Sequence, residues 1–280
     1  MKKREKMVIL VTGGSSGIGY DTAIRLAQKG HKVYAAARRV AMMEPLKEYG
    51  ITPMLLDVTD KDSREAVVDA IAEREGRIDA LVNNAGYGYF GAIENVSSDE
   101  AHRQLEVNVF GLAEMCRLVL PHMRSQHWGR IVNIASIAGR AVFPLGGWYH
   151  VSKYSVEALS DALRSEVKRF GIEVSIIEPG CIATDWGIIA AEHLEQSSKG
   201  TPYETPGMTE AALMKWAYSN NRMTSPSRIS KAIVRACCSR CPRTRYRLGR
   251  FSRISIFMHH VLPTRWWDAM LRKMLSLKLK

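Results

Sequence analysis

The 280-residue sequence has no apolar run that approaches the 18 or so residues of a membrane-spanning helix. Its N-terminal MKKREKMVIL is basic, but the apolar stretch behind the charges is too short for a signal peptide. We therefore expect a cytoplasmic protein. With 46% hydrophobic residues, the chain is long enough to bury one substantial core.

Cysteines are few and clustered, which does not suggest a disulfide framework. The five are Cys116, Cys181, Cys237, Cys238 and Cys241. Cys238 and Cys241, with His259 and His260 further along, form the one pattern that suggests zinc. It contains a single Cys pair, and its histidines are adjacent rather than spaced as zinc ligands are. We predict no metal site.

Acidic residues are almost absent from residues 240–280, which hold eleven Lys or Arg and one acid, Asp268. This segment carries +10 of the net charge of +12. An apolar helical stripe lies within it, formed by Trp267, Met270, Leu271, Met274 and Leu275. Such a basic amphipathic helix either makes a peripheral contact with an anionic membrane or packs against the domain. Because the sequence contains no recognised nucleic-acid-binding module, we expect no nucleic-acid partner.

Short apolar segments alternate with helical ones along most of the chain. Continuous apolar strands separated by helices predict an α/β fold, a Rossmann-type doubly wound parallel sheet of about seven strands with helices on both faces. The strands are expected at 7–12, 32–37, 52–58, 78–86, 129–136, 172–180 and 245–249, and the helices at 17–30, 42–50, 62–76, 98–124, 147–170 and 225–239.

We expect residues 1–250 to form one dinucleotide-binding and catalytic domain. Within it, residues 185–222 are irregular in pattern and form the substrate-binding segment. Residues 251–280 are predicted to be a basic amphipathic helical extension.

The glycine-rich stretch TGGSSGIG, residues 12–19, follows the first strand and opens the first helix. Glycines allow the backbone to turn tightly beside a pyrophosphate, and the helix N-terminus offers N–H donors to it. This context predicts a dinucleotide site made by Gly13, Ser15, Ser16, Gly17, Ile18 and Gly19.

The residues after the second strand indicate which dinucleotide binds. An acid there would bind the ribose hydroxyls of NAD, whereas this chain has Arg38 and Arg39, which suit a 2′-phosphate. We therefore predict NADP(H). Asp57 and Val58 end the third strand, where the adenine would lie. Asn84, Ala85 and Gly86 end the fourth, at the same ligand-binding edge of the sheet.

The motifs together resemble the short-chain dehydrogenases/reductases, over about residues 7–185 and on through 249. They are TGGSSGIG, NNAG, Ser136 after the fifth strand, YHVSK, and Pro179-Gly180 with Thr184. The resemblance implies that Pro179, Gly180 and Thr184 contact the cofactor. It also suggests the 17β-hydroxysteroid/retinol dehydrogenase-like branch, although Cys181 and Ala183 depart from the residues expected there.

The resemblance implies four catalytic residues. Tyr149 would be the general acid/base, and Lys153, one helical turn away, would lower the pKa of its phenol and hold the nicotinamide ribose. Ser136 would hydrogen-bond the substrate carbonyl, and Asn108 would support a water leading to the lysine. The cofactor carries the hydride while these residues handle the proton.

Apolar and aromatic residues near these motifs predict a hydrophobic carbonyl or alcohol substrate. The resemblance implies that this substrate is steroid-, retinoid- or lipid-like. The expected contacts are Tyr87, Phe143, Trp148 and Trp186, with Phe90 and Leu145 nearby. Two alternatives are a reductase of a keto lipid or acyl intermediate, and a catalytically silent NADP(H)-binding sensor. By analogy with the family, we expect a homodimer or homotetramer formed through the helices at 98–124 and 147–170.

Overall fold

All seven predicted strands are present in the computed structural model, which describes residues 5–184, 186–219, 223–249 and 252–276. They form one parallel sheet in the order β3-β2-β1-β4-β5-β6-β7. The chain reverses its direction of winding between β1 and β4, and in such sheets ligands bind beyond the carboxyl ends of the strands at this point. The strands are β1 (Val8–Thr12), β2 (Lys32–Ala37), β3 (Thr52–Leu55), β4 (Ala80–Asn83), β5 (Gly129–Ile134), β6 (Ile172–Pro179) and β7 (Arg245–Leu248).

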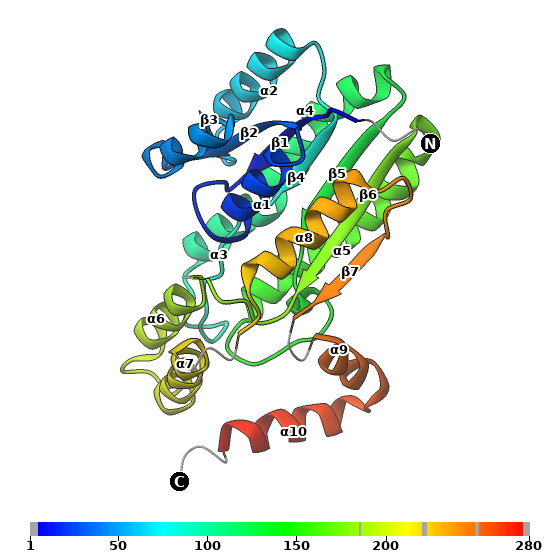
Figure 1. The fold of residues 1–280 in the computed structure, drawn as a ribbon. Helices are drawn as coiled ribbons and strands as arrows, with labels where there is room; N and C mark the ends of the chain where they lie inside the picture. The colour runs from blue at the N-terminus through cyan, green and yellow to red at the C-terminus, as the bar shows by residue number, and fades with distance from the viewer. Residues whose placement is uncertain (1–4, 185, 220–222, 250–251, 277–280) are drawn as a thin grey trace.

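Helices cover both faces of the sheet (Figure 1). Alternate residues of each strand point to opposite faces, so Ile9 and Val11 pack in one apolar cluster while Val8 and Leu10 pack in the other. The first cluster lies under α1 (Gly17–Ala27) and α8 (Pro226–Cys238). The second lies under α2 (Lys61–Glu75), α4 (Leu112–Ser125) and α5 (Gly147–Val167). The predicted doubly wound fold is confirmed.

Three predicted elements differ in detail. The helix expected at 42–50 is a 3-10 helix, η1 (Val40–Tyr49), which contains Pro45; proline removes an α-helical hydrogen bond. The single helix expected at 98–124 is α3 (Ser98–Leu105), a π-helical turn η2 (Glu106–Gly111) and α4. Within the range 185–222, which the sequence predicts to be irregular, the described residues 186–219 are largely helical and form α6 (Trp186–Ser198) and α7 (Glu204–Ser219). Two short 3-10 turns are η3 (Ile137–Gly139) and η4 (Lys168–Phe170).

The C-terminal extension forms two helices, α9 (Ser252–Val261) and α10 (Thr264–Ser276), beneath the carboxyl edge of the sheet (Figure 1). Trp267 and Leu271 are buried with Ala141 in a small apolar cluster. Two of the five residues in the predicted stripe therefore pack against the domain, and Met270 is partly buried beside them. The side chains of Met274 and Leu275 lie outside the described residues. No helix in the described part of the chain is long and apolar enough to span a membrane.

Candidate active site

The glycine-rich turn between β1 and α1 is closed by Asn84 from the end of β4. The amide of Asn84 donates hydrogen bonds to the carbonyls of Thr12 and Gly13, each at 3.1 Å. Gly13 has φ +66°, and a Cβ on Gly19 would lie 2.4 Å from the Gly13 carbonyl oxygen. Larger residues would force this turn apart, so its compactness requires glycine.

The N-terminus of α1 carries polar donors suited to an anion. Ser16 is its N-cap but makes no side-chain capping hydrogen bond. Arg39 reaches across from the end of β2 and lies 3.3 Å from the hydroxyls of both Ser15 and Ser16. Helix N–H groups, two hydroxyls and a guanidinium thus gather at one point. Ile18 packs against the core.

Arg38 lines a cavity of about 500 Å³ beside the end of β3. Asp57 accepts hydrogen bonds from the backbone N–H and the hydroxyl of the lining residue Thr59, at 3.0 and 2.8 Å. Burial acts to raise the pKa of Asp57, but these hydrogen bonds and the charge of Arg38 outweigh it, so the pKa is lowered. Val58 is buried. The cavity lining is Arg38, Thr59, Tyr87, Tyr89, Glu100, Arg103, Val107 and His193.

Tyr149 lies in the first turn of α5, beside Ser136 from the end of β5. Only 7% of Tyr149 is exposed, and burial raises the pKa of its phenol to about 12. A hydrogen bond with Ser136 acts in the opposite direction. The net direction is the reverse of the one predicted from the sequence, because the loss of solvation outweighs the favourable contacts.

Lys153 lies one turn further along α5, with its Nζ 5.8 Å from the centre of the Tyr149 ring. The ammonium donates a 3.0 Å hydrogen bond to the Ile134 carbonyl. Burial lowers the pKa of Lys153 to about 8, although the charge of Glu157 acts to raise it. A Cβ on Gly86 would lie 3.7 Å from this Nζ, so the NNAG loop passes beside the lysine.

Asn108 lies in the π-helical turn η2 and is 1% exposed. Its amide donates to the Tyr87 carbonyl at 2.8 Å and to the Ser152 hydroxyl at 3.0 Å, and its oxygen accepts from the Tyr87 N–H at 3.0 Å. Asn108 therefore ties the loop after β4 to the catalytic helix. Such single π turns are frequent at functional sites.

Aromatic rings surround Tyr149. Phe90 and Trp186 lie with their ring centres 5.4 and 5.2 Å from that of Tyr149, and their own rings meet edge to face. Tyr87 is directed elsewhere, since its hydroxyl donates to Glu100 at 2.7 Å. Trp148, which precedes Tyr149 in the sequence, is partly buried.

His150, which sequence reasoning did not select, holds the loop beside the site. Its Nδ1 lies 2.8 Å from the Ala138 carbonyl, and its Nε2 accepts a hydrogen bond from the Phe143 N–H at 3.1 Å. Burial lowers the pKa of this imidazole. The other side of the loop contacts the C-terminal extension, because the indole N–H of Trp267 donates to the Val142 carbonyl at 3.1 Å. The motif YHVSK shows where His150 lies in the sequence, but it does not reveal these contacts.

The segment after β6 closes over the glycine-rich turn. A Cβ on Gly17 would lie 3.3 Å from the Thr184 methyl, so the two loops nearly touch. The N–H of Gly180 donates to the Leu248 carbonyl at 2.7 Å, and the Ser136 hydroxyl lies 3.5 Å from the Pro179 carbonyl. Pro179, Gly180 and Thr184 thus lie between Ser136 and the turn at α1.

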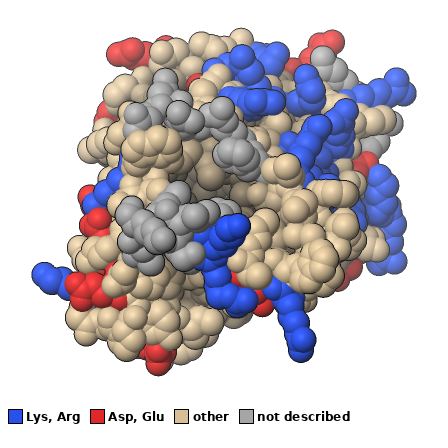
Figure 2. All heavy atoms as spheres, turned by 90° about the horizontal axis from the view of Figure 1, so that it is seen from below, with Lys and Arg blue, Asp and Glu red and all other residues tan. Residues whose placement is uncertain are grey.

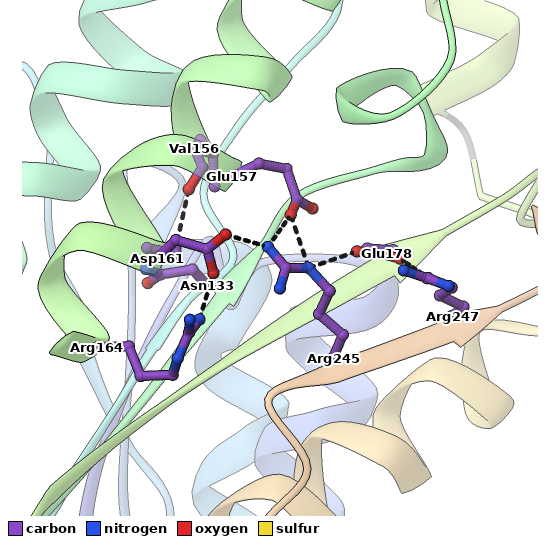
Figure 3. Close-up of polar contacts among 9 residues, drawn as sticks. Asn133, Val156, Glu157, Asp161, Arg164, Glu178, Arg245 and Arg247 are labelled. Carbon is purple, nitrogen blue, oxygen red and sulfur yellow. Dashed lines mark hydrogen bonds and ion pairs between the residues drawn. The ribbon is translucent and has the colours of Figure 1, made fainter. Parts of the chain in front are cut away.

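An ion network that includes two buried carboxylates joins α5, β6 and β7 (Figure 3). The Arg245 guanidinium of β7 lies 3.1 Å from Glu157 of α5 and 3.1 Å from Glu178 of β6, and it also pairs with Asp161 at 2.5 Å. Glu157 and Glu178 are 4% and 0% exposed. Burial and the neighbouring Glu178 raise the pKa of Glu157. Because Glu157 follows Lys153 by one turn, the network fixes the catalytic helix to the sheet.

The predicted site residues thus gather along one edge of the sheet, with glycines and cations at one end and Tyr149, Ser136 and Lys153 at the other. The anion-binding helix N-terminus, the guanidinium at Ser15 and Ser16, and the glycines that allow close approach all fit a dinucleotide. Among the described residues, no cluster of His, Cys, Asp and Glu could hold a metal ion. Fold and site together define a dinucleotide-dependent oxidoreductase.

Comparison with known proteins supports this class of protein. The family model for short chain dehydrogenase matches residues 7–193, and the chain belongs to this family. It is 32% identical over 263 residues to a probable short-chain type dehydrogenase/reductase, VdlC, of Helicobacter pylori, covering 94% of this chain and 96% of the relative. A 3-ketodihydrosphingosine reductase of Bacteroides thetaiotaomicron is 42% identical over 177 residues, or 63% of this chain and 64% of that one.

A solved structure is also similar. The alcohol dehydrogenase from the archaeon Thermococcus sibiricus, complexed with 5-hydroxy-NADP, superposes with a TM-score of 0.70 at 26% identity, covering 88% of this chain and 97% of that one. The comparisons do not distinguish the hydroxysteroid/retinol dehydrogenase-like branch from other branches of the family.

Proposed function

We propose that the protein is an NADP(H)-dependent oxidoreductase that interconverts a hydrophobic ketone or aldehyde and the corresponding alcohol. The observation that carries this proposal is the placement of Tyr149, Ser136 and Lys153 together at the carboxyl edge of the sheet. A protein that only bound the cofactor would have no need of a buried phenol hydrogen-bonded to a serine beside a buried ammonium.

In the reductive direction, the bound cofactor supplies the hydride, and this chain supplies the proton. The Tyr149 phenol, whose pKa burial raises to about 12, is protonated at neutral pH, as a proton donor to the carbonyl oxygen must be. Ser136 orients that oxygen, and the Lys153 ammonium stabilises the phenolate left after transfer. The aromatic side chains of Phe90 and Trp186 exclude water from the phenol.

Arg38 and Arg39 favour NADP(H) over NAD(H). Arg39 reaches the hydroxyls at the glycine-rich turn, while Arg38 lines the adjoining cavity with Thr59 and Val107. Two guanidinium groups can hold a 2′-phosphate through charge-assisted hydrogen bonds. The similar archaeal alcohol dehydrogenase was solved with an NADP analogue, which supports the same cofactor here.

The aromatic surroundings of Tyr149 support an apolar substrate of the steroid, retinoid or lipid kind. A keto lipid is the second candidate, because the Bacteroides relative is named as a 3-ketodihydrosphingosine reductase. We also propose a homodimer or homotetramer formed through the α3–η2–α4 segment and α5. Exposed apolar side chains that such an interface would cover are Phe110 in η2, and Val151 and Tyr154 on α5.

Titration with NADPH and NADH, followed by nicotinamide fluorescence, tests the cofactor. We expect tighter binding of NADPH, and an Arg38→Ala variant should weaken NADPH binding about tenfold or more while leaving NADH binding unchanged, since hydrogen bonds to charged groups contribute about 1.5–3 kcal/mol. Arg74→Ala removes an exposed arginine of α2 and serves as the control. Equal or tighter binding of NADH by the wild type would contradict the assignment.

A further inference from the structure

The C-terminal helices have two apolar faces, of which the domain covers only one. The covered face contains Ile256, Trp267 and Leu271. The other carries Ile254, Phe257 and Val261 on α9, where the spacing of three and four residues places them on one side of the helix. These three side chains are between 56% and 62% exposed, and Trp266 at the start of α10 is 69% exposed.

Further apolar side chains lie exposed on the same end of the molecule. Ile188 and Ile189 on α6 and Trp216 on α7 are each at least 41% exposed, and α7 contacts α10 at the lower end of Figure 1. Large apolar side chains on a monomer surface are usually scattered singly. A concentration of this kind marks an interaction site.

The charge around these side chains is positive. Residues 252–273 contain four cationic side chains, Arg253, Arg265, Arg272 and Lys273, against one acid, Asp268, and all five are exposed. Figure 2 views the molecule from this end, and its blue side chains gather mainly on the right of the view. A cationic surface repels a second copy of itself, but it attracts an anionic partner surface.

We propose that this surface, which we call the outer tail face and define as Ile254, Phe257, Val261 and Trp266 with Arg253 and Arg265, docks the protein on an anionic lipid bilayer. Exposed aliphatic and aromatic side chains among Arg and Lys are the composition of a helix that lies in the membrane interface. Trp266 suits that position, since indoles favour the interfacial layer.

The proposal differs from the stripe that the sequence suggests, because Trp267 and Leu271 are engaged with the domain. Those two residues hold α10 against the loop at 141–143, and the outer tail face is left for the membrane. Docking would bring the edge of the sheet that carries Tyr149 close to a source of apolar substrate. The docking itself does not depend on the proposed reaction.

Co-sedimentation of the full chain with vesicles tests the proposal. The vesicles are pure phosphatidylcholine, or phosphatidylcholine with about one third phosphatidylglycerol, and the salt concentration is varied. We expect the wild type to bind the anionic vesicles, to bind the neutral ones at least tenfold more weakly, and to be released by high salt. The double variant Phe257→Ser/Trp266→Ser and the charge-reversed Arg253→Glu/Arg265→Glu should each lose binding by at least tenfold.

The matched control is Met42→Ser/Leu55→Ser, which removes two exposed apolar side chains remote from the tail and should bind like the wild type. Circular dichroism melts and NADPH titration of every variant show that the fold and the cofactor site persist. Absence of wild-type binding to anionic vesicles, or unchanged binding by Phe257→Ser/Trp266→Ser, would overturn the proposal. So would a change of oligomer mass in that variant without a change in vesicle binding, because the face would then join two copies.

Discussion

Replacing Arg245 with methionine removes a side chain that contacts Glu157, Asp161 and Glu178 together (Figure 3). Methionine keeps a chain of similar length but leaves two buried carboxylates without this cation. Breaking a buried ion pair by removing one partner costs about 3–5 kcal/mol. Arg247 still pairs with Glu178 at 2.8 Å, so we expect the free energy of unfolding to fall by the lower end of this range, about 3 kcal/mol.

The loss should depend on pH in a definite direction. Glu157 already has a raised pKa in the folded protein, so the folded state binds more protons there than the unfolded state, and stability falls as pH rises through that range. Without Arg245 the pKa of Glu157 rises further. Both folded proteins hold this proton below about pH 7, whereas above it Glu157 ionises in the wild type and stays protonated in the variant. The destabilisation of Arg245→Met relative to the wild type should therefore change little at lower pH and grow as the pH rises above about 7.

Urea unfolding and thermal melts at several pH values measure this effect. A loss of about 3 kcal/mol corresponds to a fall in Tm of about 6–12 °C for a chain of this size. Arg117→Met is the control, because Arg117 forms an exposed pair with Glu114 that should contribute under about 1 kcal/mol. A loss below about 1 kcal/mol at pH 8, or one that does not change with pH, would refute the argument that these carboxylates depend on Arg245.

Two further predictions concern the site. Trp267→Ala removes the hydrogen bond to the loop that contains Phe143 and should lower kcat/KM for an apolar ketone about tenfold, with NADPH affinity unchanged. The reason is that small misplacements near the reacting atoms are costly. Trp266→Ala is the exposed control, and an equal loss of kcat/KM in both variants would contradict the role of the loop. NADPH affinity should weaken as the pH rises through about 8, because Lys153 loses its proton there in the free protein. Lys153→Met should bind NADPH weakly at every pH, without this dependence. Fluorescence titration across pH measures the effect, and an identical pH dependence in Lys153→Met would exclude the lysine as its source.

The sheet was predictable because its strands are apolar runs that end at glycines or polar turns, and each of the seven lies where the pattern places it. The π-helical turn around Asn108 was not, since nothing in VNVFG interrupts the helical periodicity. The helical content of 185–222 was also missed. Its Gly and Pro residues suggest breaks, but Gly207 lies inside α7, where Ser198 packs against it so closely that a Cβ would clash.

The cofactor turn and the Tyr149–Lys153 pair follow from local motifs, so the sequence was sufficient to find them. Their environment depends on distant segments. The pKa of Tyr149 is set by burial under residues such as Phe90 and Trp186, and sequence spacing to Lys153 cannot reveal that burial. The ion network joins residues up to 88 positions apart, and Glu157 resembles an ordinary surface acid in the sequence.

Turnover of a panel of apolar ketones and aldehydes with NADPH, compared between the wild type and Tyr149→Phe, tests the central claim most directly. Tyr154→Phe on the same helix is the matched control, because Tyr154 lies at the surface. The account predicts that Tyr149→Phe lowers kcat by about 10²–10⁴-fold while NADPH binding is kept, and that Tyr154→Phe remains active. Full activity in Tyr149→Phe would contradict the proposed mechanism.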